Sequence, residues 1–141
     1  MIFLILVLVG IVIFSFLVFL NYDKDLDDSK ITVSVNQVVE VIDGDTFKTY
    51  GGEIVRLICI DTPEKGISGY FEAKEFLSEL ILDKVVSMDK DLEDKDAYGR
   101  SLRYVYADGL FVNQKMVQEG YAEVFRYGNN TARCNEIEGF N

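Results

Sequence analysis

Four carboxylates stand at the two ends of one short stretch of this chain, where together they could hold a metal ion. Asp43 and Asp45 precede one apolar run, and Asp61 and Glu64 end the next. Oxygen ligands of this kind are those that hard cations such as Ca²⁺ take in proteins. Arg56 lies inside the second apolar run, where a charge is costly unless it has an anionic partner. These residue types predict a hard-cation site with a positively charged clamp for an anion beside it.

Two β-branched runs joined by Gly51-Gly52 are the elements that must bring these residues together. A two-residue glycine turn tolerates the positive φ angles of a tight hairpin. Folding the hairpin brings its acidic ends together, so carboxylates that are distant in the sequence can converge. Gly44, between two aspartates, is expected to form a bulge or bend that aims both acids. The alternative is a hairpin whose acidic ends are simply solvated.

Composition restricts how the chain can meet a polyanion. Its 141 residues carry 24 acids and 14 bases, a net charge of −10. Such an acidic body repels nucleic acid. Any nucleic-acid site must therefore be a local positive pocket that a bound cation assists. The two cysteines do not decide the redox compartment.

The first twenty residues have no charge and are long enough, as a helix, to cross a bilayer. They lack the basic start and the small-residue cleavage site of a signal peptide. We therefore expect residues 1–20 to be an uncleaved transmembrane anchor, with a cleaved signal peptide as the alternative. Residues 21–30 are expected to be an acidic linker. The protein is then expected to associate with the membrane through this helix and to hold its domain outside the cytoplasm. If the segment is cleaved, the expectation is a secreted protein.

Residues 31–141 are predicted to form one domain. Apolar periodicity predicts a helix with Ala73, Leu77 and Ile81 on its buried face. The other expected elements are strands over 38–42, 54–60, 85–88 and 102–106, a helix over 112–117 that stops at Gly120, and a partly extended segment over 121–127. The acidic run over 89–96 is expected to be a solvated loop. Short strands with two interposed helices favour a mainly β, α+β fold, a five-stranded OB-fold barrel.

Three blocks carry a resemblance to a known family. They are VIDGDT at 41–46, VRLICIDTPE at 55–64 and YGRSLRYVYADG at 98–109. In this order and spacing they resemble the staphylococcal nuclease, or thermonuclease, family over residues 33–133. The resemblance implies the same OB-fold and a Ca²⁺-dependent nuclease that hydrolyses phosphodiester bonds of DNA, and of RNA as a further substrate, to leave 3′-phosphate ends. No protein partner is predicted.

The resemblance also implies the metal ligands. Asp45 and Asp61 would ligate Ca²⁺, and the backbone carbonyl of Thr62 would complete the protein ligands. Asp43 would support the loop behind these ligands.

The catalytic residues are implied in the same way. Glu64 would hold the attacking water as general base, or orient it. Arg56 and Arg100 would bind the phosphate oxygens through two hydrogen bonds each. Each arginine has a structural alternative. Arg100 could cap a strand at the surface, and Arg56 could form an ion pair with Asp61 or Glu64.

Aromatic residues are implied to contact the nucleotide. Tyr98 matches an aromatic residue that lines the family's nucleotide pocket, and Phe125 and Tyr127 are candidates for base stacking.

A disulfide between Cys59 and Cys134 is implied because the family's architecture places the loop near Cys134 against the strand that carries Cys59. Two buried thiols are the alternative. The domain is expected to be short at its C-terminus, without the basic helix of the family.

A non-catalytic OB-fold module that binds nucleic acid or protein is the rival interpretation. The acidic composition and the short C-terminus favour it, whereas the intact set of carboxylates and arginines favours the enzyme.

Overall fold

The computed structural model describes residues 34–139. These residues belong to one compact unit, Val33–Asn141. The anchor predicted at 1–20 and the linker predicted at 21–30 lie outside the described residues. Within residues 34–139, no helix is both long and apolar enough to cross a membrane.

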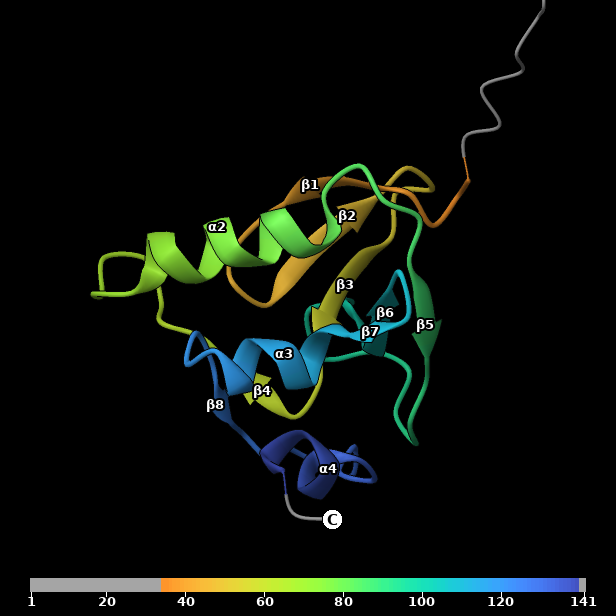
Figure 1. The fold of residues 1–141 in the computed structure, drawn as a ribbon. Helices are drawn as coiled ribbons and strands as arrows, with labels where there is room; N and C mark the ends of the chain where they lie inside the picture. The colour runs from red at the N-terminus through yellow and green to blue at the C-terminus, as the bar shows by residue number, and fades with distance from the viewer. Residues whose placement is uncertain (1–33, 140–141) are drawn as a thin grey trace, which may run out of the picture. The chain divides into compact units, whose positions relative to one another are not determined.

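A six-stranded sheet is the main element of the domain (Figure 1). Its strands are β1 (Val38–Val41), β2 (Thr46–Thr49), β3 (Ile54–Leu57), β5 (Ser87–Asp89), β6 (Ser101–Ala107) and β7 (Leu110–Phe111). Antiparallel pairing joins β1 to β2 and β2 to β3, β6 runs parallel to β3, and β5 and β7 pair with β6. A separate two-stranded sheet contains β4 (Ile60–Asp61) and β8 (Glu123–Val124).

The predicted hairpin is the β2–β3 pair. Its turn contains Gly52 with φ of 85°, the left-handed conformation that glycine adopts at little cost. The register places Thr46 opposite Arg56. Because β2 begins at Thr46, this register brings Asp45 beside the arginine. The hairpin therefore positions the first acidic end of the stretch as the sequence predicted.

Within residues 34–139 the strands do not form a closed barrel, where the sequence predicted a five-stranded OB-fold barrel. The strand order is open, with β1 and β5 at its ends, and one isolated bridge between Gln37 and Val85 connects those ends. Backbone hydrogen bonds from Val38 N to Lys84 O (2.9 Å) and from Val86 N to Asn36 O (3.2 Å) flank it. The mainly-sheet α+β class is confirmed, and it is consistent with an OB-fold.

The strand expected over 54–60 is interrupted. It ends at Leu57, and Ile58 and Cys59 form a turn before β4 begins. Cys59 has φ of 64°, a conformation uncommon for a residue with a side chain. The turn redirects the chain from the main sheet to β8. Cys59 therefore lies in a turn between two strands. The sequence had instead placed it inside one continuous strand.

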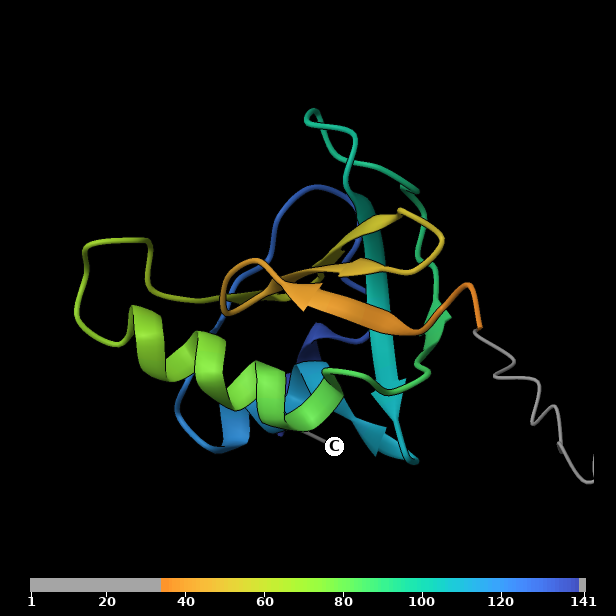
Figure 2. The same ribbon diagram turned by 90° about the horizontal axis from the view of Figure 1, so that it is seen from above.

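Three helices complete the described domain. They are α2 (Tyr70–Ile81), α3 (Val112–Gln118) and α4 (Cys134–Glu138). The apolar face predicted for α2 is confirmed, with Ala73, Leu77 and Ile81 buried. This face packs on β1 and α3 (Figures 1 and 2).

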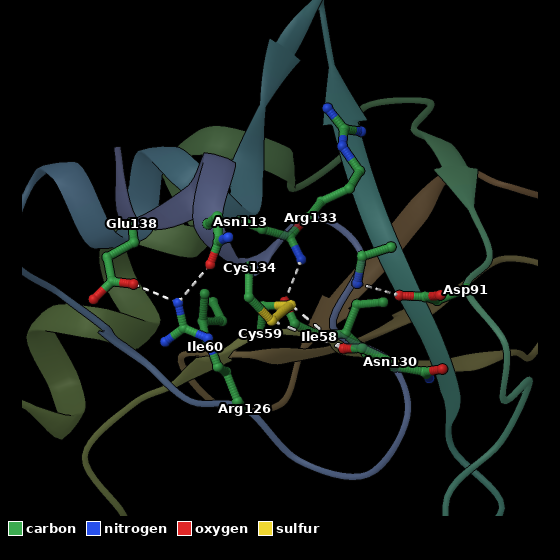
Figure 3. Close-up of a disulfide and its surroundings, with 12 residues drawn as sticks. Ile58, Cys59, Ile60, Asp91, Asn113, Arg126, Asn130, Arg133, Cys134 and Glu138 are labelled. Carbon is green, nitrogen blue, oxygen red and sulfur yellow. Dashed lines mark hydrogen bonds and ion pairs between the residues drawn. A yellow bond between two sulfur atoms is a disulfide. The ribbon is translucent and has the colours of Figure 1, made fainter. Parts of the chain in front are cut away.

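The C-terminal part of the domain contains a helix that the sequence analysis did not expect. The short helix α4 buries Cys134 and Ile137 and packs against α3 and β8 (Figure 1). Cys134 forms a disulfide with Cys59 at a Cα–Cα distance of 5.1 Å (Figure 3). Its buried sulfur therefore connects the last described helix to the turn between β3 and β4.

Candidate active site

The loop between β1 and β2 carries the first two carboxylates. Gly44 packs so tightly there that a Cβ would lie 2.7 Å from Thr62 Oγ1 and 2.8 Å from Ala73 Cβ. Only glycine allows the loop to approach both β4's end and α2 so closely. Asp43 Oδ1 accepts a hydrogen bond from the backbone N–H of Asp45 at 3.2 Å. Asp43 thus supports the loop that holds Asp45, the part that the resemblance implied for it.

Arg56 joins the two acidic ends of the stretch. Its Nη2 lies 3.0 Å from Asp45 Oδ2 and 3.0 Å from Asp61 Oδ1. Its Nη1 donates to the backbone carbonyls of Leu57 (2.5 Å) and Ile60 (2.9 Å). The carboxylates converge as predicted, but the group at their meeting point is a guanidinium. The ion pair with Asp61, weighed as an alternative role for Arg56, is present in the structure.

Asp45 is the most buried of these carboxylates, with 6% of its surface exposed. Burial raises its pKa to about 6, the positive charge of Arg56 opposes the rise, and Asp43 adds to it. The hydroxyl groups of Thr46 and Thr62 donate to its two oxygens at 2.9 and 3.2 Å. Its charged form is therefore costly in this setting unless a positive charge lies beside it.

A polar cavity of about 250 Å³ contains every predicted metal and catalytic side chain. Its lining residues are Asp43, Asp45, Arg56, Asp61, Thr62, Pro63, Glu64 and Arg100. Within residues 34–139, no group of three or more Asp, Glu, His or Cys side chains is arranged to hold a metal ion. Asp45 and Asp61 reach a common point, whereas Glu64 is an exposed wall of the cavity. Two carboxylates with a threonine form an all-oxygen set, which fits the ligand preference of Ca²⁺.

Arg100 is held at the cavity by a residue that the sequence analysis missed. Asp96 Oδ2 accepts from Arg100 Nε at 2.6 Å, and its Oδ1 accepts the backbone N–H groups of Tyr98 and Arg100 at 2.9 and 3.0 Å. Arg100 Nη1 lies 3.5 Å from Thr46 Oγ1, so its other end faces the start of β2. The guanidinium lies 5.5 Å from the Tyr98 ring centre. Asp96 therefore fixes both the arginine and the backbone of the loop that carries the tyrosine.

A second cavity of about 250 Å³ adjoins the first through Arg56 and Arg100, which line both. Its walls include the three aromatic residues implied to contact a nucleotide, Tyr98, Phe125 and Tyr127. Phe125 and Tyr127 stack with ring centres 6.2 Å apart and planes 10° from parallel. The structure thus gathers all predicted metal-binding, catalytic and nucleotide-contacting residues into one acidic and one aromatic cavity that share two arginines.

The acidic run over 89–96 is not merely solvated. Asp91 Oδ2 accepts from the Tyr104 hydroxyl at 2.7 Å and from the backbone N–H of Ala132 at 3.0 Å. Asp94 pairs with Arg103 at 2.8 Å. Only for Asp96 does the sequence carry a signal: an aspartate four residues before Arg100, with Gly99 between them, is typical of a turn closed by the aspartate side chain.

Comparison with known proteins places these features in context. Residues 54–140 match a family model described as staphylococcal nuclease homologue. The chain is 33% identical over 111 residues to a thermonuclease of Staphylococcus hyicus, and 37% identical over 99 residues to that of Staphylococcus intermedius. It is 38% identical over 108 residues to the SPbeta prophage-derived endonuclease YokF of Bacillus subtilis (strain 168).

These alignments cover 72%, 64% and 69% of this chain, in the same order, and 66%, 59% and 36% of the relatives. The chain therefore spans less than two thirds of the length of each of these relatives.

Proposed function

This chain belongs to the staphylococcal nuclease family, and from that premise we propose that it is a Ca²⁺-dependent nuclease that hydrolyses phosphodiester bonds of DNA and RNA. The observation that carries the proposal is the junction of the two cavities at Arg56 and Arg100. One cavity offers oxygen ligands and the other offers aromatic faces. A phosphodiester between a stacked base and a bound cation would lie between the two guanidinium groups.

The acidic cavity would hold the cation and the water. Asp45 and Asp61, with the backbone carbonyl of Thr62, would bind Ca²⁺, and the ion would supply positive charge to the phosphate oxygens. Glu64, exposed at the edge of the cavity, would accept a proton from the attacking water or orient it. The proposed product is a 3′-phosphate end.

The arginines would neutralise charge that develops on the phosphate. A guanidinium fork can donate two hydrogen bonds to phosphate oxygens. Asp96 takes the Nε of Arg100, and Nη1 has only a long contact of 3.5 Å with Thr46 Oγ1, so the outer nitrogens of Arg100 can turn to a phosphate. Arg56 must exchange its carboxylate partners for the phosphate, which becomes favourable once a cation takes those carboxylates.

We also propose that residues 1–20 anchor the protein with its domain outside the cytoplasm. The Cys59–Cys134 disulfide supports this location, because disulfides persist in oxidising compartments. Mass spectrometry of the mature protein tests the anchor, and a chain that begins near residue 21 would instead indicate a secreted enzyme.

A binding module without catalysis is the second candidate. One observation favours it: Nη1 and Nη2 of Arg56 already have protein partners, two carboxylates and two carbonyls. A domain that never binds a cation would keep this arrangement and would bind nucleic acid without cleaving it.

The deciding experiment measures cleavage of single-stranded DNA by the full chain in detergent, with Ca²⁺ and then with a chelator. The nuclease proposal predicts cleavage that requires Ca²⁺ and products with 3′-phosphate ends. Glu64→Gln should reduce turnover about 100-fold or more without changing the melting temperature, because it removes the group that handles the water. Glu75→Gln, at an exposed position on α2, is the matched control. DNA binding without cleavage, or full turnover by Glu64→Gln, would favour the binding module.

A further inference from the structure

The disulfide adjoins the aromatic cavity and does not line the acidic one. Cys59 lines that cavity, and its backbone carbonyl accepts the N–H of Phe125 at 2.9 Å. The turn that contains Cys59 therefore holds the start of the segment that carries the two stacked aromatic rings. The disulfide joins this turn to the first residue of α4 (Figure 3).

Asn130 rests on the disulfide and also lines the aromatic cavity. Its backbone carbonyl oxygen lies 3.4 Å from Cys59 Sγ and 3.9 Å from Cys134 Sγ (Figure 3). Asn130 is only 3% exposed. Both the oxygen and the nitrogen of its side-chain amide form hydrogen bonds. Asn130 Oδ1 accepts the N–H of Glu93 at 2.7 Å, and Asn130 Nδ2 donates to the Glu93 carbonyl at 2.8 Å.

These two hydrogen bonds connect Asn130 to the loop that, from Asp96 to Arg100, continues into the wall of the cavity. Glu93 precedes Asp96 by three residues in the same loop, and Asp96 holds the backbone of Tyr98 and both the backbone and the side chain of Arg100. A shift of Glu93 would therefore displace the loop that carries Tyr98 relative to Phe125, whereas Arg100 directly precedes β6 and stays bonded to Asp96. The buried amide is therefore a link between the disulfide and the acidic loop, beside the Ala132–Asp91 and Asn129–Glu93 hydrogen bonds.

We propose that Asn130 and the Cys59–Cys134 disulfide act as one positioning unit that sets the separation between the two walls of the aromatic cavity. The inference rests on the proposed function and assigns to this unit the affinity for the nucleic-acid strand. Turnover should change less than affinity, because Asp45, Asp61 and Arg56 are held by contacts that do not include Asn130.

The chain supplies a matched control in the neighbouring residue. Asn129 is also an asparagine bonded to Glu93, but it is exposed and donates to the carboxylate Oε1 at 2.8 Å, not to the backbone. A role limited to surface hydrogen bonding would make both asparagines equivalent. The positioning role makes only Asn130 important.

The test uses the full chain in detergent with Ca²⁺. It measures KM and kcat on single-stranded DNA, and the dissociation constant of a fluorescently labelled single-stranded DNA by anisotropy. Asn130→Ala should raise both KM and the dissociation constant about tenfold, with kcat within about threefold, because two buried hydrogen bonds are lost. Asn129→Ala should stay within about twofold of wild type. Asn130→Asp keeps the acceptor for Glu93 N–H but puts a carboxylate oxygen against the Glu93 carbonyl, so it should also raise KM and the dissociation constant.

The disulfide is tested by coupling. Cys59→Ala/Cys134→Ala should also raise KM, and adding Asn130→Ala should increase KM little further, since residues that act as a unit are not additive. Equal KM values for the two asparagine variants, effects on kcat alone, or effects that multiply would overturn the inference. If Asn130→Ala does not fold, wild-type affinity in Asn130→Asp would overturn it. Wild-type protein that neither binds nor cleaves DNA would overturn the proposed function as well.

Discussion

Replacing Arg56 with methionine tests whether this arginine neutralises the acidic cavity before a cation binds. Methionine keeps the unbranched apolar part of the side chain and removes every donor. The Arg56 side chain is 14% exposed, that of Asp45 8% and that of Asp61 50%. Removing the guanidinium therefore destabilises mainly the buried Asp45 carboxylate, since water can solvate Asp61.

The size of the loss in stability is limited because Asp45 can become protonated when Arg56 is absent. Its pKa is about 6 even beside the guanidinium, so without Arg56 it can take up a proton. At pH 7.5 this protonation costs about 2 kcal/mol, from 1.4 kcal/mol per pH unit, and this cost caps the penalty from Asp45. The carbonyls of Leu57 and Ile60 lose their donor, at about 1 kcal/mol each before water replaces it. We expect the free energy of unfolding to fall by about 3 kcal/mol at pH 7.5 and by about 1 to 2 kcal/mol at pH 5, where Asp45 is already protonated.

Urea denaturation of the full chain in chelator, followed by circular dichroism at both pH values, measures this difference. Arg126→Met is the matched control, because Arg126 is 43% exposed and pairs with Glu138 at the surface (Figure 3). It should change the free energy of unfolding by less than about 1 kcal/mol at either pH. A penalty for Arg56→Met below that of the control, or one equal at the two pH values, would refute the reasoning.

Calcium adds an independent arm to the same experiment. If Ca²⁺ binds Asp45 and Asp61, it supplies the charge that Arg56→Met lacks. A concentration about 100 times the dissociation constant stabilises a folded protein by about 2.7 kcal/mol. The gap between variant and wild type should therefore narrow in Ca²⁺. A gap that stays unchanged would show that Ca²⁺ does not use these two carboxylates.

Two further predictions concern the loop between β1 and β2. In chelator, the free energy of unfolding of the wild type should fall as pH rises from about 4 to 6, because the folded state binds the Asp45 proton more tightly than the unfolded state does. Asp45→Asn should remove this pH dependence. In urea denaturation at pH 7, this variant should be about 2 to 3 kcal/mol more stable than the wild type. The pH dependence persisting in Asp45→Asn would assign it to another group. Gly44→Ala should lower the free energy of unfolding by about 1 to 3 kcal/mol, because its Cβ would overlap Thr62 and Ala73. It should also weaken Ca²⁺ binding, measured by calorimetry. A wild-type free energy of unfolding together with wild-type Ca²⁺ affinity would show that the loop can move aside.

The features predicted correctly from the sequence depend on residues close to one another along the chain. The Gly51-Gly52 turn sets the β2–β3 register, and the register alone places Asp45 beside Arg56. The helical spacing of Ala73, Leu77 and Ile81 defines the buried face of α2 in the same local way. Among contacts between distant segments, the Cys59–Cys134 disulfide was implied by the family resemblance alone, and the contact between Asn130 and Glu93 could not be foreseen. Asn130 and Glu93 are 37 residues apart, and nothing in an acidic run shows which of its backbone groups a remote amide will take.

The interruption between β3 and β4 was missed because every residue from Ile54 to Ile60 except Arg56 is apolar. The arginine itself is the signal. A buried guanidinium needs several acceptors, and the carbonyls of a continuous strand are directed at neighbouring strands. Only a turn can bring two nearby carbonyls of one segment to the same nitrogen, and here Leu57 and Ile60 both accept from Arg56 Nη1. Arg56 thus binds the carbonyls on both sides of the turn between β3 and β4. The same turn brings Asp61 close to Asp45, and both carboxylates pair with Arg56.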